Sequence, residues 1–154
     1  MLTDHERKEI EVEASRYLRP QAAAVDAMKI LQHHRSWVSE EALQDVGDLL
    51  QMTKAELDSV ATFYNLIFRK PVGRHVIMIC NSVTCWVMGH PGLRQHLIQH
   101  LGIDLGQTTA DGRFTLLPIV CLGDCDHAPT MMVDNQLYRD LTPEKIDEIL
   151  ASYS

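Results

Sequence analysis

Apolar and polar positions follow a helical period through most of residues 1–70. In the stretch 4–18, apolar side chains return at spacings of three and four residues, at Ile10, Ala14, Tyr17 and Leu18. This spacing predicts an amphipathic helix, because residues three and four apart share one helix face. Pro20 then favours the start of a second helix over 22–34, since proline fits the first helical turn.

The next two helices are predicted from the residues that start them. Ser39 can cap a helix over 40–52, because its hydroxyl accepts a hydrogen bond from a free backbone amide. Thr53 and Glu56 carry the sequence signature of a capping box, which opens a helix through Phe68. Four helices are therefore expected in the first part of the chain.

The pattern changes at Pro71 and Gly73, where the helical period gives way to short apolar runs. Residues 75–79 form one such run, bounded by turn residues, and this is typical of a buried strand. We place the domain boundary here. Residues 1–72 are predicted to form a helical bundle, and residues 73–154 a second domain.

The second domain is predicted to mix strands and helices in the order β-α-β-β-β-α. Its predicted elements are a strand over 75–79, a helix over 90–101 stopped by Gly102, a strand leading into Cys121, a hairpin turning at Asp134–Asn135, and a last helix from Thr142. The predicted fold class is therefore α/β, a helical bundle followed by a domain built on a mixed sheet.

Composition and charge narrow the class of protein. Hydrophobic residues make up 45% and charged residues 23% of the 154 residues, as in an average soluble globular protein. No apolar run approaches the ~20 residues of a membrane span, and the acidic start lacks the pattern of a secretory signal. The formal charge of −7 argues against nucleic acid, because a phosphate backbone selects basic surfaces. A cytoplasmic protein is expected.

All four cysteines fall in two close pairs. Cys80 and Cys85 follow one predicted strand, and Cys121 and Cys125 follow another. Thiols stay reduced in the cytosol, so paired cysteines there are more typical of a metal or redox site than of disulfides. Four thiolates in an acidic protein repel one another unless a cation neutralises them, and zinc and iron are the candidates.

The spacing alone leaves zinc and an iron–sulfur cluster open. The patterns C-x4-C and C-x3-C lie at or within the ligand spacings of zinc sites. A cluster is favoured because this domain already has an apolar core, and because Gly123 can adopt a backbone conformation that directs an amide at sulfur. Without a C-x2-C run, the two-plus-two arrangement suits a [2Fe-2S] cluster with two thiolates on each iron.

Longer motifs carry a resemblance to a known family. The cysteine spacing occurs together with the segments VATFYNLIFRKPVGRHVI, GQTTADGRFTLLP, CLGDC and APTMMV. In these motifs the chain resembles the family of E subunits of bacterial respiratory complex I, the NADH:quinone oxidoreductase. The resemblance covers nearly the whole chain.

The resemblance implies a fold, a cofactor and partners. Domain 73–154 would be a thioredoxin-like ferredoxin domain whose one [2Fe-2S] cluster is held by Cys80, Cys85, Cys121 and Cys125. Domain 1–72 would dock on the flavin-bearing subunit. The chain would exchange single electrons with the FMN that takes hydride from NADH, on the cytoplasmic peripheral arm and beside the other subunits of that arm.

The same resemblance implies that the chain is not an enzyme by itself. It has no G-x-G-x-x-G motif, so FMN and NADH would be bound by the partner subunit. No residue of this chain is expected to be catalytic. The alternative is the equivalent subunit of an NAD-linked hydrogenase or formate dehydrogenase.

A regulator with a helix-turn-helix over residues 39–64 is a hypothesis from another class. Its recognition helix would set Lys54 against Glu56 and Asp58, and would present little positive charge to DNA. Packing between helices explains the pattern better.

The aromatic residues have two possible roles. Phe63, Tyr64 and Phe68 form a cluster that would suit an interface, although core packing is favoured. Trp86 follows Cys85 directly, and either shields the site from water or contacts a partner.

We make specific predictions for four other residues. His96 and His100 lie four apart on one helix face, and a solvated surface is favoured over a metal site because no carboxylate is near in the sequence. Asp124, between two cysteines, would lower the reduction potential of a cluster if its carboxylate points there, and is otherwise a solvated or helix-capping residue. Pro129 precedes a strand, where thioredoxin-like folds often place a cis proline.

Overall fold

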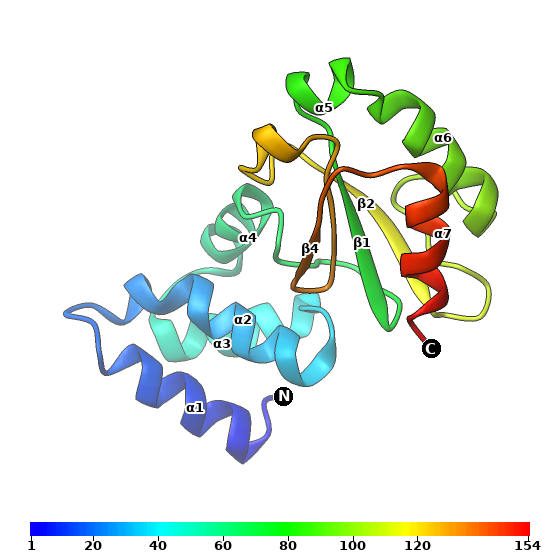
Figure 1. Ribbon diagram of the computed structural model, residues 1–154. Coiled ribbons are helices and arrows are strands. Elements are labelled where there is room, and N and C mark those ends of the chain that lie inside the picture. The colour runs from blue at the N-terminus through cyan, green and yellow to red at the C-terminus, as the bar shows by residue number, and fades with distance from the viewer. The chain divides into compact units, whose positions relative to one another are not determined.

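The computed structural model describes residues 1–154, the whole chain (Figure 1). The chain divides into two compact units, Met1–Pro71 and Val72–Ser154, here called the helical unit and the sheet unit. Each has its own hydrophobic core. No helix combines the length and the apolar character needed to cross a bilayer.

The helical unit consists of helices packed on one apolar core. Its elements are α1 (Asp4–Ala14), the 3-10 turn η1 (Pro20–Ala23), α2 (Ala24–Arg35), α3 (Glu40–Leu50) and α4 (Lys54–Phe63). The predicted caps of the last two are confirmed. The Ser39 hydroxyl accepts from the Ala42 amide, and Thr53 and Glu56 form a capping box. The core is made mainly by Ile10, Met28, Leu31, Leu43, Leu50 and Leu57.

Helix α1 is shorter than predicted. The Ser15 hydroxyl donates to the Val12 carbonyl at 2.7 Å, and the Tyr17 amide bonds to the Ala14 carbonyl three residues back. This tighter turn ends the helix, since an α-helix bonds four residues back. Tyr17 and Leu18 are consequently exposed, and the apolar stripe predicted through them is wrong beyond Ala14.

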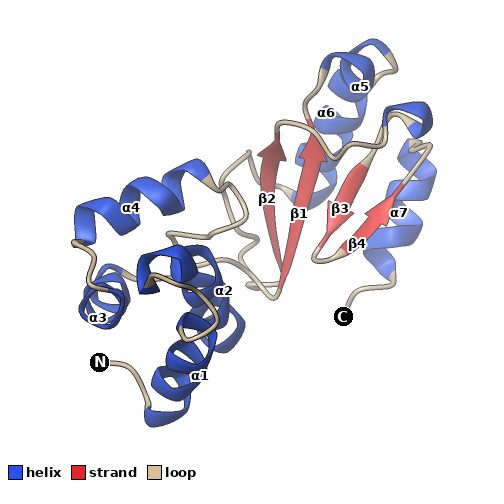
Figure 2. Ribbon diagram, turned by 90° about the vertical axis from the view of Figure 1, so that its left-hand side faces the viewer, coloured by secondary structure: helices blue, strands red, loops and turns tan.

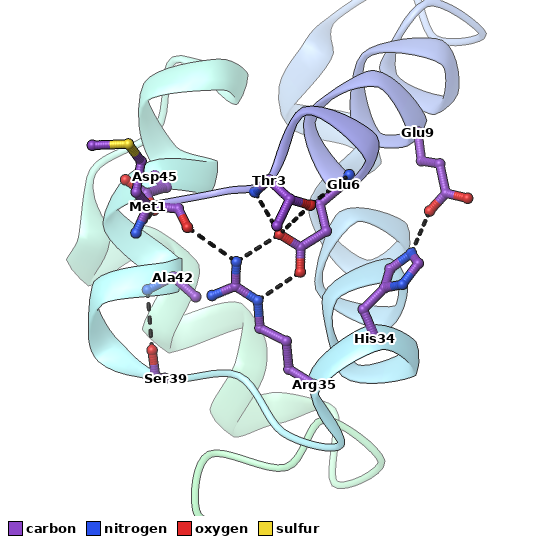
Figure 3. A network of polar contacts seen from close by, with 9 residues as sticks. All are labelled: Met1, Thr3, Glu6, Glu9, His34, Arg35, Ser39, Ala42 and Asp45. Atoms are coloured by element: carbon purple, nitrogen blue, oxygen red, sulfur yellow. Dashed lines mark hydrogen bonds and ion pairs between the residues drawn. The ribbon is translucent and has the colours of Figure 1, made fainter.

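A buried ion pair joins α1 to α2 (Figure 3). Both carboxylate oxygens of Glu6, a residue only 3% exposed, accept from the Arg35 guanidinium at 2.6 Å. The amide and hydroxyl of Thr3 donate to the same carboxylate at 2.8 and 3.0 Å. The pKa of Glu6 is lowered to about 2, mainly because Arg35 binds its carboxylate. Burial of the carboxylate opposes this shift, and the hydrogen bonds from Thr3 add to it. We call this contact the Glu6–Arg35 clasp.

Two aromatic residues at the end of α4 lie outside the core. Helix α4 ends at Phe63, which is 81% exposed, and Tyr64 takes an extended backbone and is also exposed. Their rings contact each other edge to face, with centroids 5.2 Å apart. Core packing was therefore the wrong expectation for both residues, and Phe68 is only half-buried.

The sheet unit follows the predicted order of strands and helices, with one additional α-helix and one 3-10 turn. It comprises β1 (His75–Cys80), α5 (Val83–Val87), α6 (His90–Leu101), β2 (Phe114–Ile119), the 3-10 turn η2 (Cys125–His127), β3 (Met131–Val133), β4 (Gln136–Tyr138) and α7 (Pro143–Ala151). The short helix α5 was not predicted. The strands lie in the order β2-β1-β3-β4, with β1 and β2 parallel and the other pairs antiparallel. The predicted α/β class with a mixed sheet is thus confirmed.

Helices α6 and α7 cover one face of the sheet (Figure 2). Alternate strand residues point into this layer, because side chains alternate between the faces of a strand. The resulting core holds Ile77, Ile79, Phe114, Leu116, Met131 and Val133 from the strands and Leu93, Leu97, Ile146, Ile149 and Leu150 from the helices. The helix ends match the prediction, with Gly102 at φ +68° after α6 and the Thr142 hydroxyl capping α7.

Candidate functional site

Parallel pairing brings both cysteine pairs to one edge of the sheet. Cys80, the last residue of β1, pairs in register with Ile119, the last residue of β2. The Asn81 amide donates to the Ile119 carbonyl at 2.8 Å, which ties the two strand ends together. Cys121 follows two residues later, so both pairs leave the sheet where the β1 and β2 arrowheads lie side by side in Figure 2.

The first pair is buried. Cys80 and Cys85 are each 2% exposed. Cys85 lies within α5, and its Sγ is 3.7 Å from the Thr130 hydroxyl oxygen. The Thr130 carbonyl also accepts from the Cys80 amide at 3.2 Å. Thr130, just before β3, therefore contacts both cysteines of this pair.

The second pair is exposed and sits in a tight loop. Gly123 adopts φ +74°, a conformation that glycine takes without strain, and its amide donates to Cys121 Sγ at 3.3 Å. This confirms the expected direction of a backbone amide at sulfur. Cys125 begins the 3-10 turn η2. All four cysteines of the chain are free thiols.

The loop after Cys125 is fixed by backbone hydrogen bonds. The Ala128 amide donates to the Cys125 carbonyl at 3.4 Å, and the Leu141 amide donates to the Pro129 carbonyl at 3.1 Å. The Ala128–Pro129 peptide bond is cis, which confirms the sequence prediction. The loop thus leads from an exposed cysteine directly to Thr130 beside the buried pair.

Asp124 is held by a cation that the sequence did not indicate. Arg139, which follows β4, donates to both Asp124 oxygens, at 2.6 and 3.3 Å. The Asp124 side chain is 13% exposed and makes no capping bond to η2, so the solvated and capping interpretations are both wrong. Its charge lies beside the cysteine loop but is paired.

The comparison with known proteins decides the family. The family model described as thioredoxin-like [2Fe-2S] ferredoxin matches residues 10–154. This chain is a member of that family. The predicted family, its thioredoxin-like fold and its single [2Fe-2S] cluster are thereby confirmed.

Individual members of this ferredoxin family are similar over nearly the whole chain. The NADH-quinone oxidoreductase E subunit of Pseudomonas aeruginosa is 45% identical over 153 residues, which is 99% of this chain and 92% of the relative. The E subunit from Escherichia coli strain K12 is 48% identical over 152 residues, with the same coverage. A solved structure of an NAD⁺-reducing [NiFe]-hydrogenase superposes with a TM-score of 0.71 at 26% identity, over 84% of this chain and 22% of that one.

The cysteines of this ferredoxin suit the cofactor of the family. Four thiols are the usual ligand set of a [2Fe-2S] cluster. Around them, the Gly123 amide donates to Cys121 Sγ, and the Thr130 hydroxyl lies within reach of Cys85 Sγ. Such donors stabilise the negative charge on sulfur, and a ferredoxin uses them to tune its potential.

Exposed apolar side chains lie next to Cys85 and Cys121 in the sequence. We define the apolar rim as the exposed side chains Val83, Trp86, Val87, Met88 and Val120. Trp86 is 60% exposed, so the contact role is favoured over a shielding role. Val120 directly precedes Cys121 and is 78% exposed. Four of the five lie in or directly after the short helix α5, and a gathering of exposed apolar side chains is typical of a binding surface.

Sequence reasoning missed two residues of the site, Thr130 and Arg139. Thr130 contacts Cys85 across 45 positions of sequence, and Arg139 contacts Asp124 across 15. No local pattern signals either contact, because each depends on how β3 and β4 join the sheet.

Proposed function

We propose that this ferredoxin is the [2Fe-2S] electron-transfer subunit of a respiratory NADH:quinone oxidoreductase, and that it exchanges single electrons with the FMN of a flavin-bearing partner. The observation that carries the proposal is the identity of 45% and 48% with two E subunits of such oxidoreductases over 99% of the chain. The chain would belong to the peripheral arm of the complex, on its cytoplasmic face.

The ligands we propose are Cys80, Cys85, Cys121 and Cys125, one pair for each iron. When bound, the cluster supplies a centre that accepts and returns one electron at a time. The buried pair on β1 and α5 anchors it to the sheet. The exposed pair on the loop after β2 brings it to the surface, where a partner can approach.

The proposed contact surface for the flavin-bearing subunit is the apolar rim. The rim adjoins one cysteine of each pair in sequence, since Val120 precedes the exposed Cys121 and Trp86 follows the buried Cys85. A partner covering it would exclude water and bring its own redox group close to these cysteines. The helical unit offers a further docking surface at Phe63 and Tyr64, and aromatic residues are common interface hot spots.

A second candidate is the equivalent subunit of an NAD-linked hydrogenase or formate dehydrogenase. The superposition on the NAD⁺-reducing hydrogenase, with a TM-score of 0.71, favours it. The identity in that comparison is 26%, well below that with the two E subunits, so we favour the complex I assignment.

Anaerobic purification with metal analysis and a visible absorption spectrum tests the cofactor assignment. We expect two irons and two acid-labile sulfides per chain and a brown protein. One zinc per chain and no colour would contradict the proposal.

Reconstitution tests the partner. NADH alone should leave the purified chain oxidised, and NADH with the flavin-bearing complex I subunit of the same genome should bleach it. If only the corresponding hydrogenase or formate dehydrogenase subunit supports bleaching, the second candidate is correct.

A further inference from the structure

Three side chains that can bind a metal lie close together on the two helices that cover the sheet. None of them is a cysteine. His96 and His100 come from α6, and Asp147 comes from α7 beside it (Figure 1). Asp147 Oδ1 is 2.7 Å from His96 Nε2 and 3.0 Å from His100 Nδ1. The sequence favoured a solvated surface because it showed no nearby carboxylate. The fold supplies one from 51 positions away.

We propose that His96, His100 and Asp147 form a binding site for Zn²⁺. The three ligand atoms lie within 4.8 Å of one another. Ligands of a tetrahedral zinc ion are about 3.3 Å apart, as zinc–nitrogen distances of about 2.0–2.1 Å require. The two nitrogen–oxygen distances of 2.7 and 3.0 Å are slightly shorter, so small side-chain rotations admit the ion.

The backbones that carry these ligands are held by core packing. On α6, Leu93 and Leu97 are buried under the layer, and on α7, Ile146 and Ile149 are buried on either side of Asp147. A site built on packed helices keeps its ligands in place without the metal. The ion would fasten α6 to α7 over the sheet.

The donor set selects the kind of metal. Two imidazoles and one carboxylate suit zinc and neighbouring transition metals, whereas Mg²⁺ prefers oxygen ligands. The His96, His100 and Asp147 side chains are 27%, 41% and 44% exposed, so an ion can enter from solvent and keep water as a fourth ligand.

Glu144 adds negative charge near the proposed site. It lies in the first turn of α7, three residues before Asp147, so its carboxylate stands on the helix that carries this ligand.

A second trio on the helical unit provides an internal control. His5, Glu9 and His34 also place ligand atoms within 4.8 Å of one another. His34 Nε2 is 2.6 Å from Glu9 Oε2, but His5 Nδ1 is 3.7 Å from the Glu9 carboxylate, and the His5 side chain is 72% exposed on the first turn of α1. Because the His5 contact is looser, this trio should bind Zn²⁺ more weakly.

The experiment titrates Zn²⁺ into the anaerobically purified chain with its cluster in place, in buffer containing Mg²⁺, by isothermal calorimetry. One Zn²⁺ per chain should bind with the highest affinity and raise the melting temperature. His96→Ala and the conservative Asp147→Asn should each weaken this binding by more than about tenfold, since even lost outer-shell partners cost about 10–100-fold. Glu9→Gln and His34→Ala should leave it unchanged.

Zinc-edge X-ray absorption separates this site from the cysteines. The proposal predicts nitrogen and oxygen ligands at about 2.0–2.1 Å and an unchanged visible spectrum. Sulfur ligands at about 2.3 Å, with bleaching of the cluster, would overturn it. It would also be overturned if Zn²⁺ fails to bind, if Asp147→Asn binds as the unaltered chain does, or if only the helical-unit variants lose binding. The proposal does not depend on the partner of the ferredoxin.

Discussion

The helical unit and the sheet unit place their critical polar groups differently. In the helical unit, the Glu6 carboxylate is buried between two helices and forms an ion pair with Arg35. In the sheet unit, the thiols lie at a sheet edge, with Cys80 and Cys85 buried and the second pair exposed. An ion pair buried between two helices contributes to stability, whereas thiols at the end of a sheet can bind a cofactor. Substitutions in the two units should therefore fail in different ways.

The largest expected effect is at the cysteine edge. Cys85→Ser should abolish the cluster, because it removes one of four proposed ligands and a hydroxyl binds iron less well than a thiolate. Iron and sulfide analysis with visible absorption measures the loss. The helical signal in far-ultraviolet circular dichroism should remain, since the helical unit has its own core. Ser82→Ala is the neighbouring control, and full iron content in Cys85→Ser would refute the ligand assignment.

The next effect is the loss of the clasp. Arg35→Met should lower the free energy of unfolding of the helical unit by about 3 kcal/mol, because it leaves Glu6 buried without its cation. Denaturation followed by circular dichroism measures this change, and the cluster absorption before the transition should not alter. Arg16→Met removes an exposed pair with Glu13 and should cost less than about 1 kcal/mol. Equal losses in both variants would contradict the assigned role of the clasp.

The clasp also predicts a dependence on acid. The pKa of Glu6 is about 2 in the folded chain, against an ordinary value of 4.5. Because the folded value is the lower one, the stabilisation is present above pH 4.5 and is lost as pH falls from 4.5 towards 2. Unfolding measured across this range should show the loss in the unaltered chain and a much flatter profile in Glu6→Gln. Parallel profiles would show that another group controls acid stability.

A smaller effect concerns docking. Trp86→Ala in the apolar rim should weaken binding to the proposed flavin-bearing partner by about 2 kcal/mol, or roughly 30-fold, as an interface hot spot would. Surface plasmon resonance with the cluster-loaded chain measures it. Val12→Ala, at another half-exposed apolar residue, is the matched control. Phe63→Ala tests the helical surface, and if it alone weakens binding, the rim is not the contact.

The smallest effect is on the reduction potential. Asp124→Asn should raise the potential and Arg139→Gln should lower it, because negative charge disfavours the more negative reduced state. A change of about 1 kcal/mol corresponds to roughly 40 mV for one electron. The double variant should lie close to the unaltered chain, since Arg139 pairs with Asp124. Redox titration measures all three, and a downward shift in Asp124→Asn would contradict the electrostatic reasoning.

Sequence patterns predicted those features that depend on neighbouring residues. The Thr53 and Glu56 capping box, the turn at Asp134–Asn135 and the amide of Gly123 at sulfur were all found where expected. Each of these features depends on residues only a few positions apart, so the sequence alone is enough to predict it. The same holds for the cysteine spacing that carried the family resemblance.

Features that depend on packing could not be predicted in the same way. The helix α5 is a single turn and a half with no apolar period to mark it. Asp147 approaches His96 only because α6 and α7 pack side by side, and Arg139 reaches Asp124 only after β4 has joined the sheet. The exposure of Phe63 follows from where α4 ends, which local propensity places poorly.

The parallel pairing of β1 and β2 makes the positions of Cys80 and Cys121 independent of the length of the chain between α5 and β2. The register of the two strands positions Cys80 and Cys121, and Cys85 follows in the short helix directly after β1. The turn at Ala110 and Asp111 is exposed and lies at the opposite ends of these strands from the cysteines. It is therefore a permissive point for inserting a peptide tag or reporter into this ferredoxin, and a folded insert there should leave iron binding intact.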